Sequence, residues 1–91
     1  MVREVDIEWR TERWATKRGW LSRRIAYEAR TGAPDRIFVR HGVVVFIEFK
    51  RPGGRLSGSQ VLEIKKLRAH GAEVHVCWSF EQAKEVLSAH D

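Results

Sequence analysis

The sequence predicts an α/β fold in which a mixed β-sheet is flanked by helices. Two β-rich segments meet at His41-Gly42, where glycine supplies the positive φ that a two-residue hairpin loop needs. The second of them, residues 43–49, is apolar on both faces, which is typical of a strand in the centre of a covered sheet. Helical patterns lie before and after this hairpin. The expected order is therefore α-β-β-β-α-β-α, in one domain over residues 1–91.

The N-terminal elements follow from where glycine and proline occur. Residues 4–18 lack both and predict a helix that stops at Gly19. Residues 20–28 predict the first strand, and Thr-Gly-Ala-Pro marks residues 29–34 as a loop. The hairpin then begins near Asp35.

The C-terminal half reads as helix, strand and helix. Ser57 and Gln60 fit a capping box for a helix that ends at Gly71, with an apolar side made of Val61, Leu62, Ile64 and Leu67. Residues 73–78 alternate and predict a strand, and Ser79 caps a final helix that runs to about residue 89.

Composition indicates a small globular protein with an anionic partner. The 91 residues carry 17 Lys and Arg against 12 Asp and Glu, a net charge of +5, which favours a polyanion. Cys77 is the only cysteine, so neither an intrachain disulfide nor a cysteine-based metal cluster is expected. No apolar run approaches the ~20 residues of a membrane span, and the N-terminus has no signal-peptide core, so an intracellular, cytoplasmic location is expected.

The hairpin register brings two carboxylates together. If Arg40 pairs with Val43, paired residue numbers sum to 83, and Asp35 lies directly opposite Glu48. Opposed side chains on antiparallel strands have Cβ atoms about 5 Å apart. Lys50 lies two residues beyond Glu48 and points to the same face.

This trio of side chains suggests a reaction. Opposed carboxylates repel each other, so a cation nearby would offset the cost. Mg²⁺ is bound by one or two carboxylates, with water and substrate phosphate completing its shell. A neighbouring lysine then orients a water or neutralises charge on the phosphate. The pattern favours metal-assisted hydrolysis of phosphodiesters.

Pro34-Asp35 followed by Glu48-Phe49-Lys50 resembles the PD-(D/E)xK nuclease superfamily, and the strings GAPDRIFV and VVVFIEFKRPGGRLSGSQ resemble its VRR-NUC branch. The resemblance covers nearly the whole chain and implies a restriction-endonuclease-like core. It also implies that Asp35, Glu48 and the backbone carbonyl of Phe49 bind Mg²⁺ or Mn²⁺ and that Lys50 positions the attacking water.

The same resemblance adds two further candidates. Gln60 occupies a position that lies near the active site in the family, in addition to its capping role. The family also has an acidic residue on its first helix that reaches the metal, for which Glu8 is favoured over Glu12. Glu8 and Glu12 each have a simpler explanation as exposed carboxylates of a helix surface.

Basic residues outside the trio are candidates for binding DNA phosphates. Arg51 and Arg55 flank Pro-Gly-Gly directly after Lys50, and guanidinium groups bind phosphate through paired hydrogen bonds. A second basic cluster could follow the DNA backbone; its members are Lys17, Arg18, Arg23 and Arg24.

These observations predict a metal-dependent DNA endonuclease that acts as a homodimer on branched DNA, in the manner of four-way (Holliday) junction resolvases. The tryptophan-rich first helix and Trp78 are candidate pairing surfaces. Two alternatives remain open: a monomeric flap, end-processing or nicking nuclease, and a catalytically silent DNA-binding module. A phage or bacterial origin is expected from so small an autonomous domain.

Overall fold

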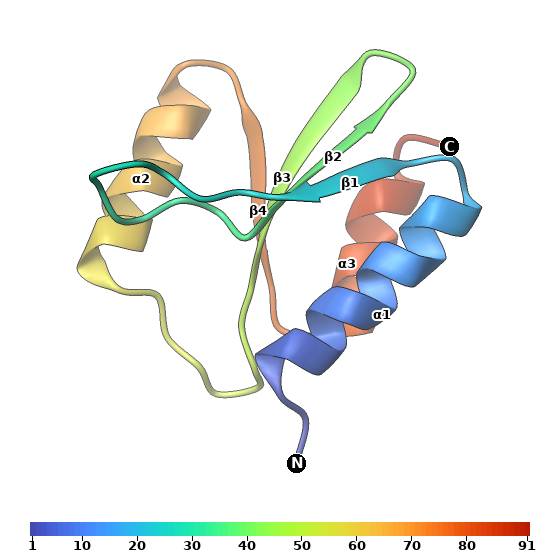
Figure 1. Ribbon diagram of the computed structural model, residues 1–91, viewed down its shortest axis with the longest axis horizontal. Coiled ribbons are helices and arrows are strands. Elements are labelled where there is room, and N and C mark those ends of the chain that lie inside the picture. The colour runs from blue at the N-terminus through green and yellow to red at the C-terminus, as the bar shows by residue number, and fades with distance from the viewer.

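The computed structural model describes all of residues 1–91 and has the expected element order (Figure 1). The elements are α1 (Glu4–Lys17), β1 (Leu21–Arg24), β2 (Arg36–Arg40), β3 (Val43–Phe49), α2 (Gly58–Ala69), β4 (Glu73–Cys77) and α3 (Phe80–Ser88).

The sheet is mixed and has the order β1-β2-β3-β4. β1, β2 and β3 are antiparallel neighbours, whereas β4 runs parallel to β3. α1 and α3 pack against each other on one side of the sheet, and α2 lies on the other side next to β4 (Figure 1). Strand β3 therefore lies inside the sheet with helices on both faces, as its apolar sequence predicts.

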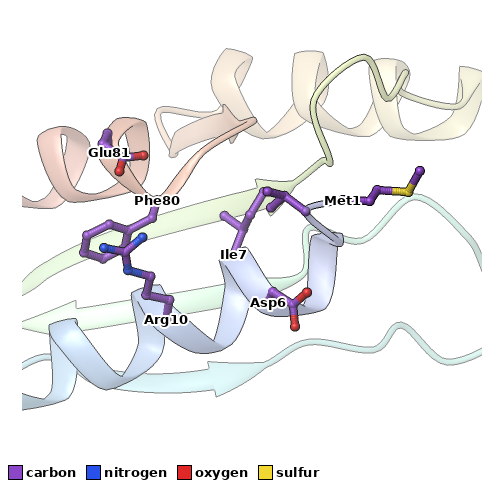
Figure 2. A pocket seen from close by; sticks show the side chains of 7 residues that line it. Met1, Asp6, Ile7, Arg10, Phe80 and Glu81 are labelled. Carbon is purple, nitrogen blue, oxygen red and sulfur yellow. The ribbon is translucent and has the colours of Figure 1, made fainter.

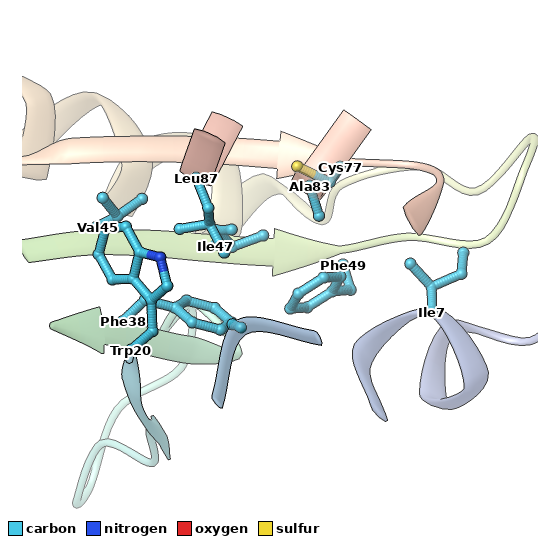
Figure 3. Packing of buried hydrophobic residues seen from close by; sticks show 10 residues of the cluster. Ile7, Trp20, Phe38, Val45, Ile47, Phe49, Cys77, Ala83 and Leu87 are labelled. Carbon is cyan, nitrogen blue, oxygen red and sulfur yellow. The ribbon is translucent and has the colours of Figure 1, made fainter. Parts of the chain in front are cut away.

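The hydrophobic core lies between the sheet and the α1/α3 layer (Figure 3). Its large members from the strands are Phe38, Val45, Ile47 and Phe49, and α3 contributes Ala83 and Leu87. Cys77 is buried in the same cluster at 1% exposure. Burial raises the pKa of its thiol to about 12.

The hairpin forms as the sequence predicts. Arg40 pairs with Val43 and Arg36 with Ile47, so the paired numbers do sum to 83. His41 and Gly42 have φ angles of 50° and 81°, the two positive values that a type I′ turn requires. The turn thereby fixes which residues face each other at the far end of the hairpin.

The first strand is shorter than predicted, because β1 ends at Arg24 and does not continue to residue 28. The following segment leaves the sheet and crosses to α2. There the Tyr27 hydroxyl donates a 2.6 Å hydrogen bond to Glu63, and Arg30 lies 3.6 Å from the same carboxylate. Ile25 N still donates a 3.0 Å hydrogen bond to Asp35 O, and the contacts with Glu63 hold the segment that follows.

The apolar side predicted for α2 is only partly buried. Ile64 is buried, but Val61 and Leu62 are 37% and 61% exposed. The reason is that α2 contacts the sheet along β4, at one edge, so most of its surface faces away. The capping box of Ser57 and Gln60 forms as expected. No helix has the length and apolar character needed to cross a membrane.

Candidate active site

Asp35 and Glu48 lie across the last rung of the β2–β3 hairpin. Asp35 precedes the first residue of β2, and continuing the observed register places it opposite Glu48. The Asp35 Oδ2 atom accepts a 2.7 Å hydrogen bond from the backbone N–H of Phe49. The Asp35 carboxylate therefore takes over the ladder bond that β2 no longer supplies.

Pro34 explains why the Phe49 carbonyl receives no hydrogen bond from β2. The same register places Pro34 opposite Phe49, and proline has no N–H to donate. The N–H and C=O of one strand residue point toward the same neighbour, so the Phe49 carbonyl faces the side on which Asp35 lies. The strand ladder supplies no donor to this carbonyl, which leaves it available as a ligand.

Glu48 is buried and its two oxygens have different environments. The residue is 2% exposed. Its Oε2 atom accepts a 2.8 Å hydrogen bond from Gln60 Nε2 and lies 3.4 Å from Lys50 Nζ. Its Oε1 atom is buried without any hydrogen-bond partner. A buried polar atom without a partner is costly, so this oxygen marks a place where a cation would be favourable.

Gln60 connects the start of α2 to this site. Its side-chain Oε1 accepts a 2.8 Å hydrogen bond from Ser57 N, which holds the amide in the capping box. The same amide donates through Nε2 to Glu48. Both explanations of Gln60 therefore apply: it caps the helix and it fixes the Glu48 carboxylate.

Both carboxylates hold their protons more tightly than usual. Burial, followed by the nearby Asp35 charge, raises the pKa of Glu48 to about 7. Burial also raises the pKa of Asp35, and the Phe49 N–H only partly offsets this effect. A divalent cation at the site would favour the ionised forms of both groups.

The donor set suits a hard divalent cation. It comprises the two carboxylates and the Phe49 carbonyl, all oxygen ligands. No group of three or more His, Cys, Asp or Glu side chains gathers closely enough to hold a metal by itself. A site with two carboxylates leaves room for water and phosphate, which is how Mg²⁺ is usually held in enzymes that act on phosphates.

The two acidic residues expected from α1 are differently placed. Glu8 is buried, and its Oε2 atom lies 2.7 Å from Arg36 Nε and 3.3 Å from Arg24 Nε. It is near enough to raise the pKa of Asp35. Glu12 instead accepts a 3.2 Å hydrogen bond from Thr16 of its own helix.

Sequence reasoning missed Glu4. The carboxylate of this residue contributes to raising the pKa of both Asp35 and Glu48, whereas Glu8 does so for Asp35. Glu4 precedes Glu8 by one helical turn and therefore shares its side of α1. The i, i+4 spacing was the signal that would have found it.

The basic candidates fall into separate groups. Arg51 and Arg55 are exposed on the loop that follows β3, close in sequence to Lys50. Arg24 belongs to the Glu8 ion pair. Lys17 and Arg18 lie at the far end of the 14-residue α1, about 20 Å from its start. Lys17 and Arg18 therefore lie away from the paired carboxylates, whereas Arg24 lies beside Glu8.

A separate cavity of about 410 Å³ lies between the starts of α1 and α3 (Figure 2). Its lining includes Ile7, Arg10 and Phe80, and the Arg10 guanidinium lies 4.1 Å from the centre of the Phe80 ring. None of the residues of the candidate active site lines it. This cavity is a seam between two helices and not the site of the paired carboxylates.

The four-stranded mixed sheet, its flanking helices and the carboxylates and lysine at the end of one hairpin define a restriction-endonuclease-like α/β domain. The family model of the VRR-NUC domain matches residues 16–81. The chain belongs to the VRR-NUC family, whose members are nuclease-type domains.

A solved structure described as a VRR-NUC domain has the same fold. It is 32% identical in sequence, with a TM-score of 0.77, and the match covers 93% of this chain and 98% of that one. A search of curated proteins found no match.

Proposed function

We propose that this protein is a Mg²⁺- or Mn²⁺-dependent nuclease that hydrolyses DNA phosphodiester bonds. One observation carries the proposal: the Glu48 carboxylate is buried opposite Asp35 with one oxygen held by Gln60 and Lys50 and the other without a partner. An arrangement in which one oxygen is fixed and the other is free suits a metal ligand better than a structural ion pair.

In this proposal, Asp35, Glu48 and the Phe49 carbonyl would hold the metal. The bound ion supplies a more acidic water and neutralises negative charge on the scissile phosphate. Glu8 or Glu12 is the proposed acidic support from α1, and the effect of the Glu8 charge on the pKa of Asp35 favours Glu8.

Lys50 has the position of a water-orienting group. Its side chain is 12% exposed, and its Nζ lies 3.4 Å from Glu48 Oε2. The ammonium donates hydrogen bonds to a water or phosphate oxygen at the mouth of the site while Glu48 keeps it in place. Arg51 and Arg55 on the adjoining loop are the proposed phosphate contacts.

The proposed substrate is branched DNA, bound by a homodimer. The net charge of +5 supports binding to a polyanion. An isologous dimer presents two equivalent sites related by a two-fold axis, which matches the symmetry of a four-way junction. A monomeric flap or nicking nuclease would use the same chemistry on a different DNA substrate.

Cleavage of end-labelled four-way junction, flap and linear duplex DNA tests the proposal, with Mg²⁺, Mn²⁺ or EDTA. We expect paired symmetric nicks in the junction that require the metal and disappear in Lys50→Ala. Lys65→Ala, which changes an exposed lysine on α2, is the matched control and should cut normally.

Each other outcome has a definite meaning. Metal-dependent cutting of flap or duplex DNA alone would support the nuclease activity and refute the proposal of a junction resolvase. Binding without cutting, in every metal, would make the chain a silent DNA-binding module. Full activity of Lys50→Ala would refute the role given to Lys50.

A further inference from the structure

The loop that joins β3 to α2 (Figure 1) has a backbone that hydrogen bonds hold in place. It begins at Lys50, whose backbone N–H donates a 2.9 Å hydrogen bond to the carbonyl of Cys77 in β4. Gly54 N then donates a 2.8 Å hydrogen bond to Arg51 O, which closes a β-turn. Proline and glycine occupy the centre of this turn, and Gly53 has a φ of 80°, as a type II turn requires at its third residue. The loop is therefore tied to β4 where it begins and folds back on itself directly afterwards.

The indole of Trp78 holds the far end of this turn. Its Nε1–H donates a 3.0 Å hydrogen bond to the Gly54 carbonyl. Trp78 directly follows β4, and its backbone N–H donates a 2.7 Å hydrogen bond to Gln82 Oε1 in α3. An indole N–H can only donate, so a carbonyl oxygen is the kind of partner that it needs. Trp78 thus links the turn to the end of β4 and to the first turn of α3.

Gly54 packs closely against Arg51. A Cβ at residue 54 would lie 3.0 Å from Arg51 O and 3.3 Å from Arg51 Cγ. Gly54 is not one of the glycines with a positive φ, so space and not backbone conformation favours glycine at this position. The missing side chain lets the stem of Arg51 lie against the turn.

Arg51 and Arg55 lie on either side of this anchored segment. The first and fourth Cα atoms of a β-turn lie within about 7 Å of each other, and Arg55 directly follows the fourth residue. Both arginines are exposed, and no ion pair of the structure includes either of them. A guanidinium on an ordered backbone loses less freedom when it binds a phosphate than one on a loose loop.

We propose that Trp78 is a positioning residue: it holds the turn so that Arg51 and Arg55 meet phosphates of the DNA at the active site. Trp78 does not itself contact DNA in this role. Because the loop begins at Lys50, the phosphates that the two arginines bind lie close to the scissile phosphate. The inference rests on the DNA substrate of the proposed function and adds the residue that orders its phosphate contacts.

A double-mutant cycle in DNA binding tests this role. Binding of fluorescein-labelled flap and four-way junction DNA is measured by anisotropy at low salt in EDTA, so that no DNA is cut. Trp78→Phe keeps an aromatic ring and removes the N–H, and we expect about 2- to 10-fold weaker binding. In a chain that already carries Arg51→Ala and Arg55→Ala, the same change should have no further effect, because the groups that Trp78 positions are gone.

Each variant has a matched control, and thermal unfolding checks that each is folded. Trp9→Phe makes the same chemical change at an exposed tryptophan of α1 and should bind like wild type. Gly54→Ala is a second variant, since its Cβ presses on Arg51 and leaves the indole intact. It should weaken binding in the same way and with the same dependence on the two arginines. Gly58→Ala, where a Cβ meets nothing within 4 Å, is its control.

Two results would overturn the inference. One is binding by folded Trp78→Phe that equals that of wild type, which includes the case in which wild type binds no DNA. The other is a loss of binding that is just as large without the two arginines, because Trp78 would then act on the fold or touch DNA directly. If Trp78→Phe does not fold, the same cycle with Gly54→Ala decides.

The inference and the nuclease proposal fail in different ways. Metal-dependent cutting that is lost in Lys50→Ala, together with full DNA binding by Trp78→Phe, would support the nuclease and refute the role of Trp78. Weaker binding by Trp78→Phe, in a chain that cuts no DNA with any metal, would support the anchored turn and refute the nuclease.

Discussion

Stability against pH is the most direct probe of the paired carboxylates. The folded chain holds the pKa of Glu48 at about 7, compared with the usual 4.5. Between these pH values the folded chain keeps a proton that the unfolded chain has released. The free energy of unfolding therefore falls as the pH rises through this window.

The magnitude follows from the same two values. At about 1.4 kcal/mol per pH unit, the difference between 4.5 and about 7 corresponds to about 3 kcal/mol. Glu48→Gln cannot ionise, so the difference in unfolding free energy between wild type and variant isolates this contribution. Glu85→Gln, an exposed glutamate on α3, is the matched control and should follow the wild type.

Urea unfolding in EDTA, from about pH 5 to about pH 8, measures the effect. We expect wild type to lose about 2.5 kcal/mol relative to Glu48→Gln over this range. Mg²⁺ should restore stability to wild type most strongly at the upper end, where Glu48 is ionised, and should have little effect on the variant. A difference that does not depend on pH would refute the argument that Glu48 is buried beside a second charge.

Two further predictions concern the supports of the site. Gly32→Ala places a Cβ 2.7 Å from a backbone carbonyl oxygen at the start of α2, at a φ of +98°, and should lower stability by about 1–3 kcal/mol in thermal unfolding. Gly53→Ala, also at positive φ but in open space, should cost less, and equal losses would contradict the steric argument. Arg36→Met leaves buried Glu8 without its closest cation and should cost about 3–5 kcal/mol. Arg24→Met removes a partner that is 69% exposed and should cost under about 1 kcal/mol in the same urea assay; the opposite ranking would show that Arg36 is not the main partner.

The hairpin was predictable because local rules determine it. A two-residue turn at His41-Gly42 fixes the register, and strand alternation then fixes which side chains share a face. Asp35, Glu48 and Lys50 follow from those rules alone. Their roles in catalysis stay a prediction until cleavage is measured.

Contacts between distant segments were not predictable in the same way. β1 is shorter than predicted, and the segment after it is held by the hydrogen bond from Tyr27 to Glu63, a partner 36 residues away. Glu8 is held by Arg36, 28 residues away, and no periodicity in α1 indicates that partner. The hydrogen bond from Gln60 to the Oε2 atom of Glu48 depends on where α2 packs against the edge of the sheet. Each of these needs the tertiary arrangement.

The buried thiol described with the core gives this chain a built-in reporter of opening. Cys77 is the only cysteine, is 1% exposed and has its pKa raised to about 12. A thiol-reactive dye should therefore label the native protein only when β4 separates from α3. The labelling rate of the unmodified protein would therefore report on how often the core opens between β4 and α3.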